Sequence, residues 1–478
     1  MKGGIDMNKF LRCFFIILCM ALCLIPTVGM PFFATNETIG NESETPFPSV
    51  TTEEGGFNSS FLPELGAYYE KHFAFRPQFI DTDARIQSKL FAVSNLDTVT
   101  VGSSDWLYYS STLDDYLGRN TLSQREINGI VHNLGLVQEY VESQGSQFLF
   151  MVAPNKNTLY PENMPYYYDV KASDEHNRDL LHKALADSEV NYLDLFSLFQ
   201  SQDETLYFKQ DSHWNNKGAL MVYNASLDAL EKRHDDYSAA EEKRVKDHYG
   251  DLAKMLYPAA QQAEYDYEYA IDASYSYVTP TKSVEDPLII TENPSASGSL
   301  YMYRDSFGNS LLPFFANAYE NARFTKSKPI NVALDNMNGM ADTVIFEIVE
   351  RNVSWFVESP PVIPSPERVL NISDSVEGTA QVSGNILEAN TQYIALSAFV
   401  DSDLCADDAT VCLRVTTPDG KSDDFEAFTL SDDESGDGFV VYIPAADYAD
   451  RELEVDIIVL EGERTTKVYH TSVDNIIL

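Results

Sequence analysis

Four short, strongly apolar segments constrain the fold of this chain most. We predict that they form buried strands, at Gln147 to Ala153, Val190 to Leu195, Ser299 to Tyr303 and Thr343 to Val349. Apolar residues at helical spacing predict one helix from Gln124 to Gln144 and another after Asn216. Strands separated by helices or long connections are typical of a parallel sheet with helices on its faces. The sequence therefore predicts an α/β fold for the central part of the chain.

The pattern changes after Glu358, where the run Ser-Pro-Pro-Val-Ile-Pro-Ser-Pro is too rich in proline to continue a helix or a central strand. Short alternating segments and turn dipeptides such as Asp419-Gly420 and Asp437-Gly438 follow, which favours an antiparallel β-sandwich. The predicted strands are Tyr393 to Val400, Val411 to Thr416, Gly438 to Ile443 and Leu453 to Leu460. We therefore expect an α/β domain over 61–358, a proline-rich linker over 359–370 and a β-sandwich accessory domain over 371–478.

The N-terminus indicates where the folded part works. Lys9 and Arg12 come before an apolar run from Cys13 to Ala34, and an acidic segment follows, an asymmetry that places the N-terminus inside and the rest outside the membrane. Since about 20 apolar residues span a bilayer, residues 1–34 fit either a signal peptide or a single-pass anchor, and the length slightly favours the anchor. The polar residues 35–60 predict a disordered spacer. We expect an extracytoplasmic protein, anchored to the membrane or secreted.

Apolar residues recur at helical spacing directly after this spacer. The pattern starts at Phe61, continues through Leu65, Tyr68, Tyr69 and Phe73, and extends to Phe91. An amphipathic helix of this kind needs a surface that covers its apolar face.

Composition and cysteine positions exclude several classes of function. The chain of 478 residues carries 33 Lys and Arg against 74 Asp and Glu, and its formal net charge of −41 repels nucleic acid and anionic lipid headgroups. Outside the N-terminal run only Cys405 and Cys412 remain, either as a small disulfide loop or as two lone thiols. Because the eight His are scattered and paired Cys are absent, we expect no metal site and no other cofactor.

The carboxyl ends of the predicted strands supply the candidate catalytic residues, because active sites of open parallel sheets form there. Ser306 follows the third strand in Tyr-Arg-Asp-Ser-Phe-Gly, at a turn into a helix whose free N–H groups can hold an oxyanion. A serine needs a base, and His213 in Asp-Ser-His-Trp-Asn is the candidate. Asp211, two residues earlier in an extended loop, points the same way and can fix the imidazole tautomer.

Four segments in order resemble the SGNH-like alginate O-acetyltransferase family and its Firmicute branch, the DHHW proteins. They are Val101 to Tyr108, Ala153 to Pro161, Tyr207 to Gly218 with its Asp-x-His-Trp-Asn motif, and Arg304 to Gly308. The resemblance covers roughly residues 61–355 and implies a triad of Asp211, His213 and Ser306 on an SGNH-like parallel-sheet sandwich. Two features depart from the family pattern. Ser212 replaces the second His of the DHHW motif, at a position that we expect to point away from the triad, and no Gly-x-Asn-Asp block supplies a second oxyanion donor.

The resemblance implies an extracytoplasmic O-acetyltransferase that acylates a cell-surface or secreted polysaccharide through an acyl-serine intermediate. A membrane-bound O-acyltransferase would supply the acetyl groups. The same triad would also serve a carbohydrate O-acetyl esterase, with water as the acceptor. A non-catalytic polysaccharide-binding surface protein is a third reading, which the presence of all three triad residue types disfavours.

Five further residues are candidates for contact with the substrate or the oxyanion. Asn155, Lys156 and Tyr160 follow the first strand, Trp214 flanks His213, and Arg351 follows the fourth strand. The alternatives are loop hydrogen bonding for the first three, packing for Trp214 and a pair with Glu350 for Arg351.

Overall fold

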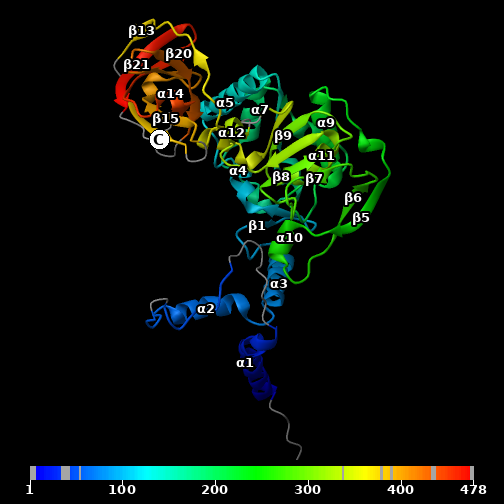
Figure 1. The fold of residues 1–478 in the computed structure, drawn as a ribbon. Coiled ribbons are helices and arrows are strands. Elements are labelled where there is room, and N and C mark those ends of the chain that lie inside the picture. The colour runs from blue at the N-terminus through cyan, green and yellow to red at the C-terminus, as the bar shows by residue number, and fades with distance from the viewer. Residues whose placement is uncertain are drawn as a thin grey trace, which may run out of the picture.

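A mixed seven-stranded sheet forms the centre of the protein (Figure 1). The computed structural model describes residues 7–33, 44–52, 55–335, 339–376, 380–387, 391–431 and 438–473. The strand order is β4-β3-β11-β9-β10-β8-β7, with β4 Tyr192–Leu193, β3 Gln147–Ala153, β11 Thr343–Val349, β9 Ser299–Tyr303, β10 Asn321–Thr325, β8 Leu288–Glu292 and β7 Ser276–Tyr277. The first five strands in this order pair in parallel, and β8 and β7 add an antiparallel edge. The predicted α/β fold is confirmed.

Helices cover both faces of this sheet, as the alternating side chains of β3 show. Leu149 and Met151 share a hydrophobic core with helices on one face, whereas Phe148 and Phe150 share a second core with helices on the other. The helices of the first core are α8 (Leu195–Gln200), α9 (Asn216–Ala229) and α11 (Leu312–Ala318), and those of the second are α5 (Gln124–Ser143), α7 (Asn177–Ala186), α12 (Val332–Asp335) and α13 (Trp355–Glu358).

The C-terminal part of the chain is a β-sandwich of two sheets, as predicted. A six-stranded sheet has the order β12-β17-β16-β20-β21-β13, and a four-stranded sheet has the order β14-β15-β19-β18. Alternating residues of both sheets, such as Leu396 and Ile457, share one core. The strands are β12 Glu367–Arg368, β13 Asp374–Ser375, β14 Ala380–Ile386, β15 Tyr393–Val400, β16 Thr410–Thr416, β17 Ser422–Glu426, β18 Phe428–Leu430, β19 Gly438–Pro444, β20 Leu453–Glu461 and β21 Arg464–Val473, with α14 Ala445–Tyr448 after β19.

The sandwich packs directly on α5. Phe428 of β18 and Tyr442 of β19 belong to the same core as the inner face of α5. Asn133 of α5 donates hydrogen bonds to the carbonyl oxygens of Phe356 and Thr429. The proline-rich segment between the two parts is packed as well, since Val362 and Ile363 are fully buried. Cys405 and Cys412 are buried and are not joined by a disulfide, which matches the alternative of two separate thiols.

Three helices precede the α/β part of the chain. α1 (Met7–Phe33) is long and apolar enough over Lys9–Phe33 to cross a bilayer, judged by length and composition alone. The apolar pattern after Phe61 forms α2 (Phe61–His72) and α3 (Arg76–Ile86), followed by the π-helical turn η1 (Gln87–Phe91). The break lies at Phe75, whose φ of 62° is left-handed. Of the predicted spacer, residues 35–43 and 53–54 lie outside the described part of the chain.

Short elements complete the rim of the α/β part. The pairs β1–β2 and β5–β6 are two-stranded antiparallel ribbons. The elements are β1 (Val99–Val101), β2 (Leu107–Tyr109), α4 (Leu113–Leu117), α6 (Lys156–Leu159), β5 (Glu242–His248), α10 (Asp251–Leu256) and β6 (Glu264–Tyr269).

Candidate active site

The loop that carries Asp211 and His213 is closed at both ends. Tyr207 and Trp214 form an isolated antiparallel bridge, and the Phe208 amide donates to the His213 carbonyl oxygen. Asn215 caps α9, because its side-chain oxygen accepts the N–H groups of Lys217 and Gly218. The loop between the bridge partners Tyr207 and Trp214 is therefore short, and the start of α9 fixes its far end.

Ser306 lies at the turn that leaves β9. One carboxylate oxygen of Asp305 accepts the Phe307 N–H at 2.9 Å, and the other accepts the Val349 N–H from the neighbouring strand β11 at 2.8 Å. Gly308 packs closely against Arg304, since a Cβ at this position would lie 2.7 Å from Arg304 Cβ. Glycine is therefore needed at this position because it lets the backbone of Gly308 lie close to the Arg304 side chain. The Phe307 amide is already engaged by Asp305, so this N–H is not available to an oxyanion.

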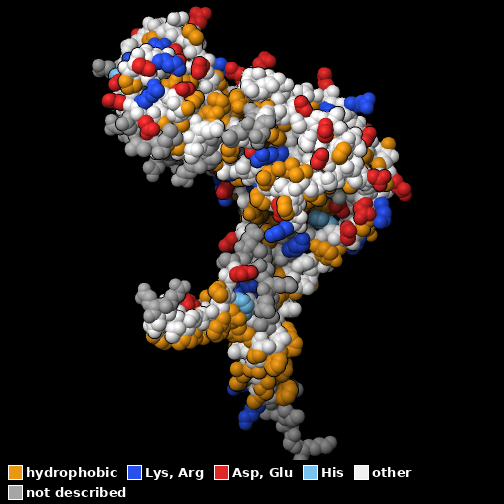
Figure 2. Space-filling model, in the orientation of Figure 1, with side chains coloured by type: hydrophobic (Ala, Val, Ile, Leu, Met, Phe, Trp, Pro, Cys, Tyr) orange, Lys and Arg blue, Asp and Glu red, His pale blue; other side chains and the backbone are white. Residues whose placement is uncertain are grey.

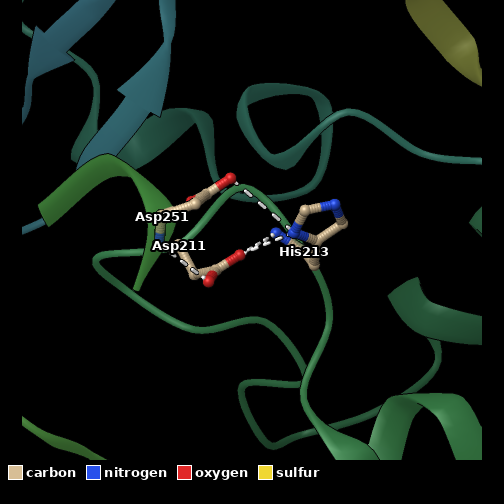
Figure 3. A group of neighbouring side chains, drawn as sticks. All are labelled: Asp211, His213 and Asp251. Carbon is tan, nitrogen blue, oxygen red and sulfur yellow. Dashed lines mark hydrogen bonds and ion pairs between the residues drawn. The ribbon is translucent and has the colours of Figure 1, made fainter. Parts of the chain in front are cut away.

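The structure brings Ser306, His213 and Asp211 together. His213 Nε2 lies 2.8 Å from Ser306 Oγ, and His213 Nδ1 lies 2.7 Å from Asp211 Oδ1. An ionised carboxylate only accepts, so Nδ1 carries the proton and Nε2 of the neutral ring can accept from the serine hydroxyl. Figure 3 shows that the carboxylates of Asp211 and Asp251 approach the same side of the His213 ring, while the rest of the ring points away from them. This arrangement can withdraw a proton from a serine hydroxyl.

A second histidine contacts the same carboxylate. His248, the last residue of β5, donates from Nε2 to Asp211 Oδ2 at 2.9 Å and stacks on Phe208 with a centroid distance of 3.7 Å. The Asp251 amide, at the start of α10, donates to the same oxygen at 3.0 Å. Gly250 allows α10 to come this close, because a Cβ there would collide with the Gln210 carbonyl.

The Asp251 side chain adds a further charge beside His213. It accepts the N–H and the hydroxyl of Ser212, at 2.8 and 2.5 Å, and its Oδ2 lies 3.8 Å from His213 Nδ1. The expectation that Ser212 points away from the triad is wrong, since its hydroxyl lies 3.2 Å from His213 Nδ1. The hydrogen bond to Asp251 holds the Ser212 side chain on the side of the His213 ring.

The electrostatics of the group favour an ionised aspartate and a basic histidine. Burial alone would raise the pKa of Asp211, but hydrogen bonds from His213 and His248 hold the pKa well below its usual value. Burial would lower the pKa of His213, but the hydrogen bond to Asp211 and the charges of Asp211, Asp251 and Asp305 raise the pKa above its ordinary value. Burial and the Asp211 charge raise the pKa of Asp251. His213 is therefore a stronger base than a free imidazole.

Asp211, His213 and Asp251 also offer three ligand atoms of the kind that bind metal ions, within 4.8 Å of one another. A cation there would compete with the Nδ1 proton of His213, since both would occupy the space between that nitrogen and Asp211 Oδ1. The proton alone accounts for the 2.7 Å separation of these atoms.

Lys156 supports the loop from behind, and Asn155 makes hydrogen bonds elsewhere. The buried Lys156 ammonium donates to the carbonyl oxygens of Phe208, Lys209 and Asp211 at 3.1, 2.9 and 2.5 Å. Burial lowers the pKa of Lys156 to about 8, against the opposing effect of nearby carboxylates. The Asn155 side chain is 1% exposed and donates to Asp115. These contacts match the loop-bonding alternative for both residues.

The three remaining candidates also make structural contacts. The Tyr160 hydroxyl accepts the Leu206 N–H. Trp214 is 1% exposed and donates from its indole nitrogen to Ser310, which leaves its ring no open face for a sugar. The Arg351 guanidinium lies over the Tyr109 ring, with 5.3 Å between the group and the ring centroid.

Glu350 carries a role that the sequence did not indicate. Its carboxylate accepts the Asn155 N–H at 2.7 Å and the Thr158 hydroxyl at 3.0 Å, and thus joins the ends of β11 and β3. Burial raises the pKa of Glu350 to about 7. His248 and Asp251 were missed in the same way, because they come from a ribbon and a helix that no motif connects to Asp211.

The central part of the chain is similar to proteins of a known family. Residues 99–296 match the family described as "SGNH hydrolase-like domain, acetyltransferase AlgX", a range that includes Asp211 and His213 and ends before Ser306. A relative described as "Probable alginate O-acetylase AlgJ", from Pseudomonas syringae pv. tomato, is 26% identical over 179 residues. This alignment covers 36% of the chain and 43% of the relative, so the chain spans less than half of the relative's length.

Solved structures with a similar arrangement include PatB1 from Bacillus cereus, at 16% identity and a TM-score of 0.42, covering 52% of this chain and 95% of that one. The O-acetyltransferase domain of Pseudomonas putida AlgJ is 15% identical with a TM-score of 0.36, covering 54% and 92% of the two chains. A DHHW family protein from Eubacterium siraeum is 16% identical with a TM-score of 0.38, covering 48% and 86%. By its family match and its curated relative, the chain carries an SGNH hydrolase-like domain of the AlgX/AlgJ-like family over residues 99–296.

Proposed function

We propose that this protein is an extracytoplasmic O-acetyltransferase that acylates a polysaccharide through a triad of Ser306, His213 and Asp211. The carrying observation is the continuous pair of hydrogen bonds from Ser306 Oγ to His213 Nε2 and from His213 Nδ1 to Asp211 Oδ1. The acetyltransferase description of the matching family supports the reaction class. The alginate O-acetylase description of the relative supports a polysaccharide as the acceptor.

The proposed reaction has two half-reactions. In the first, the proton of Ser306 passes to His213 Nε2 as Oγ attacks the donor carbonyl carbon, and the leaving group departs with that proton. In the second, His213 accepts the proton of a sugar hydroxyl as the sugar oxygen attacks the acyl carbon. Ser306 Oγ then leaves and takes the proton back. Asp211 stabilises the imidazolium in both half-reactions.

The acetyl groups must reach the site from the membrane. We propose that α1 is retained as an anchor and that a membrane-bound O-acyltransferase delivers the acetyl groups, because acetyl-CoA is confined to the cytoplasm. The apolar run that starts at Cys13 and the positive residues Lys9 and Arg12 before it support this orientation.

Partition of the acyl-enzyme tests the proposal. The full chain is incubated with an acetyl ester surrogate and a panel of oligosaccharides, and mass spectrometry measures acetylated sugar while a coupled assay measures free acetate. We expect acetylated sugar with the wild type and a loss of about 10⁴-fold in turnover for Ser306→Ala and for His213→Ala. Full turnover in a folded Ser306→Ala protein would exclude this nucleophile.

One observation favours a second candidate function, that of a carbohydrate O-acetyl esterase. The His213 side chain is 23% exposed, so water can approach the acyl-enzyme. A positioned sugar hydroxyl has an effective-molarity advantage over water, which the transferase needs and the esterase does not. Free acetate alone across the acceptor panel, with deacetylation of native polysaccharide, would assign the esterase.

A further inference from the structure

The helix α2 is amphipathic, and the described part of the chain covers its apolar side only in part, because Leu65 and Tyr69 are half-buried. Leu62, Leu65 and Tyr69 recur at helical spacing along one side, and Glu64 and Lys71 lie on the opposite side. No residue of α2 is buried, and Leu62 is 73% exposed. Figure 1 shows α2 extending sideways from the junction of α1 and α3, clear of the seven-stranded sheet and of the C-terminal sandwich. Much of this apolar side is therefore open to a surface outside the described part of the chain.

Large apolar side chains on both flanks of α2 extend the same surface. Phe57 before the helix is 75% exposed, and Phe75 and Phe79 after it are exposed as well. Figure 2 shows hydrophobic side chains along the edge of α2 that faces the α1 end of the molecule, continuous with the hydrophobic surface of α1. The exposed apolar surface is thus shared between α2 and the helix with the composition of a membrane span.

Three contacts join the end of α2 and the residues that follow it to α1, and they fix the position along α1 at which the two helices meet. The Ala74 N–H donates to the Pro26 carbonyl oxygen at 3.2 Å, and the hydroxyls of Thr27 and Tyr69 lie 2.7 Å apart. The rings of Phe33 and Phe75 stack with a centroid distance of 5.1 Å. All three contacts lie in the last two turns of α1.

That level coincides with the outer boundary of a bilayer. The apolar part of α1 starts at Cys13, after Lys9 and Arg12, and a hydrocarbon core of about 30 Å takes about 20 helical residues at 1.5 Å each. If Arg12 marks the inner boundary, the outer boundary therefore falls close to Phe32, between the contacts at Pro26 and Phe33. Tyr side chains such as Tyr69 at this junction concentrate at the headgroup level of membranes.

We infer that α2, with Phe57 and Phe75, lies in the outer-leaflet interface of the membrane with Leu62, Leu65 and Tyr69 facing the acyl chains. This inference rests on the proposed function, in which α1 is retained as an anchor. Apolar burial provides the attraction, because the net charge of −41 disfavours anionic headgroups.

A consequence is that the candidate active site sits at a set height above the lipid. α3 starts at the same junction, and its Ala84 shares a small core with Leu252 and Leu256 of α10. α10 begins at Asp251, which contacts both Asp211 and Ser212. The chain of packed elements from the membrane surface to the triad therefore has no long loop in it.

Depth-dependent fluorescence quenching tests this placement. The full chain is reconstituted into phosphatidylcholine vesicles with or without bromine on the acyl chains, and a tryptophan is introduced by Leu62→Trp. The matched variant Ala67→Trp places the same ring on the other side of α2, at a residue that is also exposed. The native Trp106, Trp214 and Trp355 lie in the globular part and provide the baseline.

We expect brominated lipid to remove most of the emission added by Leu62→Trp and little of that added by Ala67→Trp. An alkaline wash of the vesicles tests the anchor separately. A chain that resists the wash while Leu62→Trp is not quenched would overturn the placement of α2 and leave the proposed function intact. Equal quenching of the two variants would also overturn it, because α2 would then have no preferred side. A chain that the wash removes would refute the anchor itself.

Discussion

His248 donates a hydrogen bond to Asp211 through the carboxylate oxygen that His213 does not use, at 2.9 Å. The carboxylate is therefore held on both sides, and it cannot rotate away from His213 without losing a contact. His248→Phe keeps a flat ring against Phe208 but removes the donor. A hydrogen bond to a charged group contributes about 1.5–3 kcal/mol, so we expect a loss of roughly tenfold or more in kcat.

The matched variant for this position is His248→Gln, whose amide nitrogen can reach the same oxygen. We expect it to recover most of the activity that His248→Phe loses, in an assay with an acetyl ester surrogate. Melting curves of both variants verify that the fold is kept. Equal kcat for the wild type and His248→Phe would show that Asp211 needs no second partner.

Asp251 should set the pH at which the enzyme starts to work. His213 must be neutral to accept the Ser306 proton, so the rate rises as pH increases through the pKa of His213, which neighbouring carboxylates raise. Asp251→Asn removes one of these charges and keeps an oxygen that can accept from Ser212. We expect the acidic limb of the pH–rate profile to move to lower pH. A limb that stays in place or moves to higher pH would contradict the electrostatic role of Asp251.

The sequence predicted the interior of the fold better than its edges. β3 and β11 have the predicted bounds because almost every residue in them is buried, and β9 has them although Ser299 and Tyr301 are only half-buried. β10 was missed, since exposed Asn321 and half-buried Arg323 interrupt its pattern. β4 is only two residues long because just Tyr192 and Leu193 pair with β3.

The candidate site also has contacts that the sequence predicts and contacts that it does not. The contact between Asp211 and His213 follows from their spacing in one loop, and that with Ser306 from the family motif. The approach of His248 depends instead on where the β5–β6 ribbon packs. There, Glu264 of β6 accepts the N–H groups of Lys209 and Gln210 and fixes the ribbon beside the loop. Such a tertiary contact leaves no periodic signal in the sequence.

Glu350 should make the protein less stable as pH rises. Its folded pKa of about 7 lies above the ordinary value of 4.5, so between these values the unfolded chain releases a proton that the folded protein keeps. The free energy of unfolding therefore falls over this window, by about 2 kcal/mol from this group between about pH 5 and pH 7. Glu350→Gln should reduce the fall by that amount in denaturation curves at the two pH values. An unchanged fall would contradict the raised pKa.

Two glycines of α5 should respond to alanine with opposite signs, because only one of them faces the C-terminal sandwich. A Cβ at Gly129 would lie 2.5 Å from Thr429 Cγ2 of β18, whereas a Cβ at Gly135 would meet nothing within 4 Å. Thr429 cannot move away easily, since its N–H and its carbonyl oxygen are both bonded to the side chain of Asn133. We expect Gly129→Ala to lower the free energy of unfolding by about 1–3 kcal/mol, as overpacking does.

The opposite result is expected at the open position. Gly135→Ala should raise the free energy of unfolding by up to about 1 kcal/mol, through the higher helix propensity of alanine. Thermal melts of the two variants and the wild type provide the measurement, and limited proteolysis between residues 359 and 370 reports whether the sandwich has separated from α5. Stabilisation by both substitutions would mean that β18 does not pack on α5 in solution. In that case the sandwich would be an independent domain on a flexible linker, and the burial of Val362 and Ile363 would be lost with the contact.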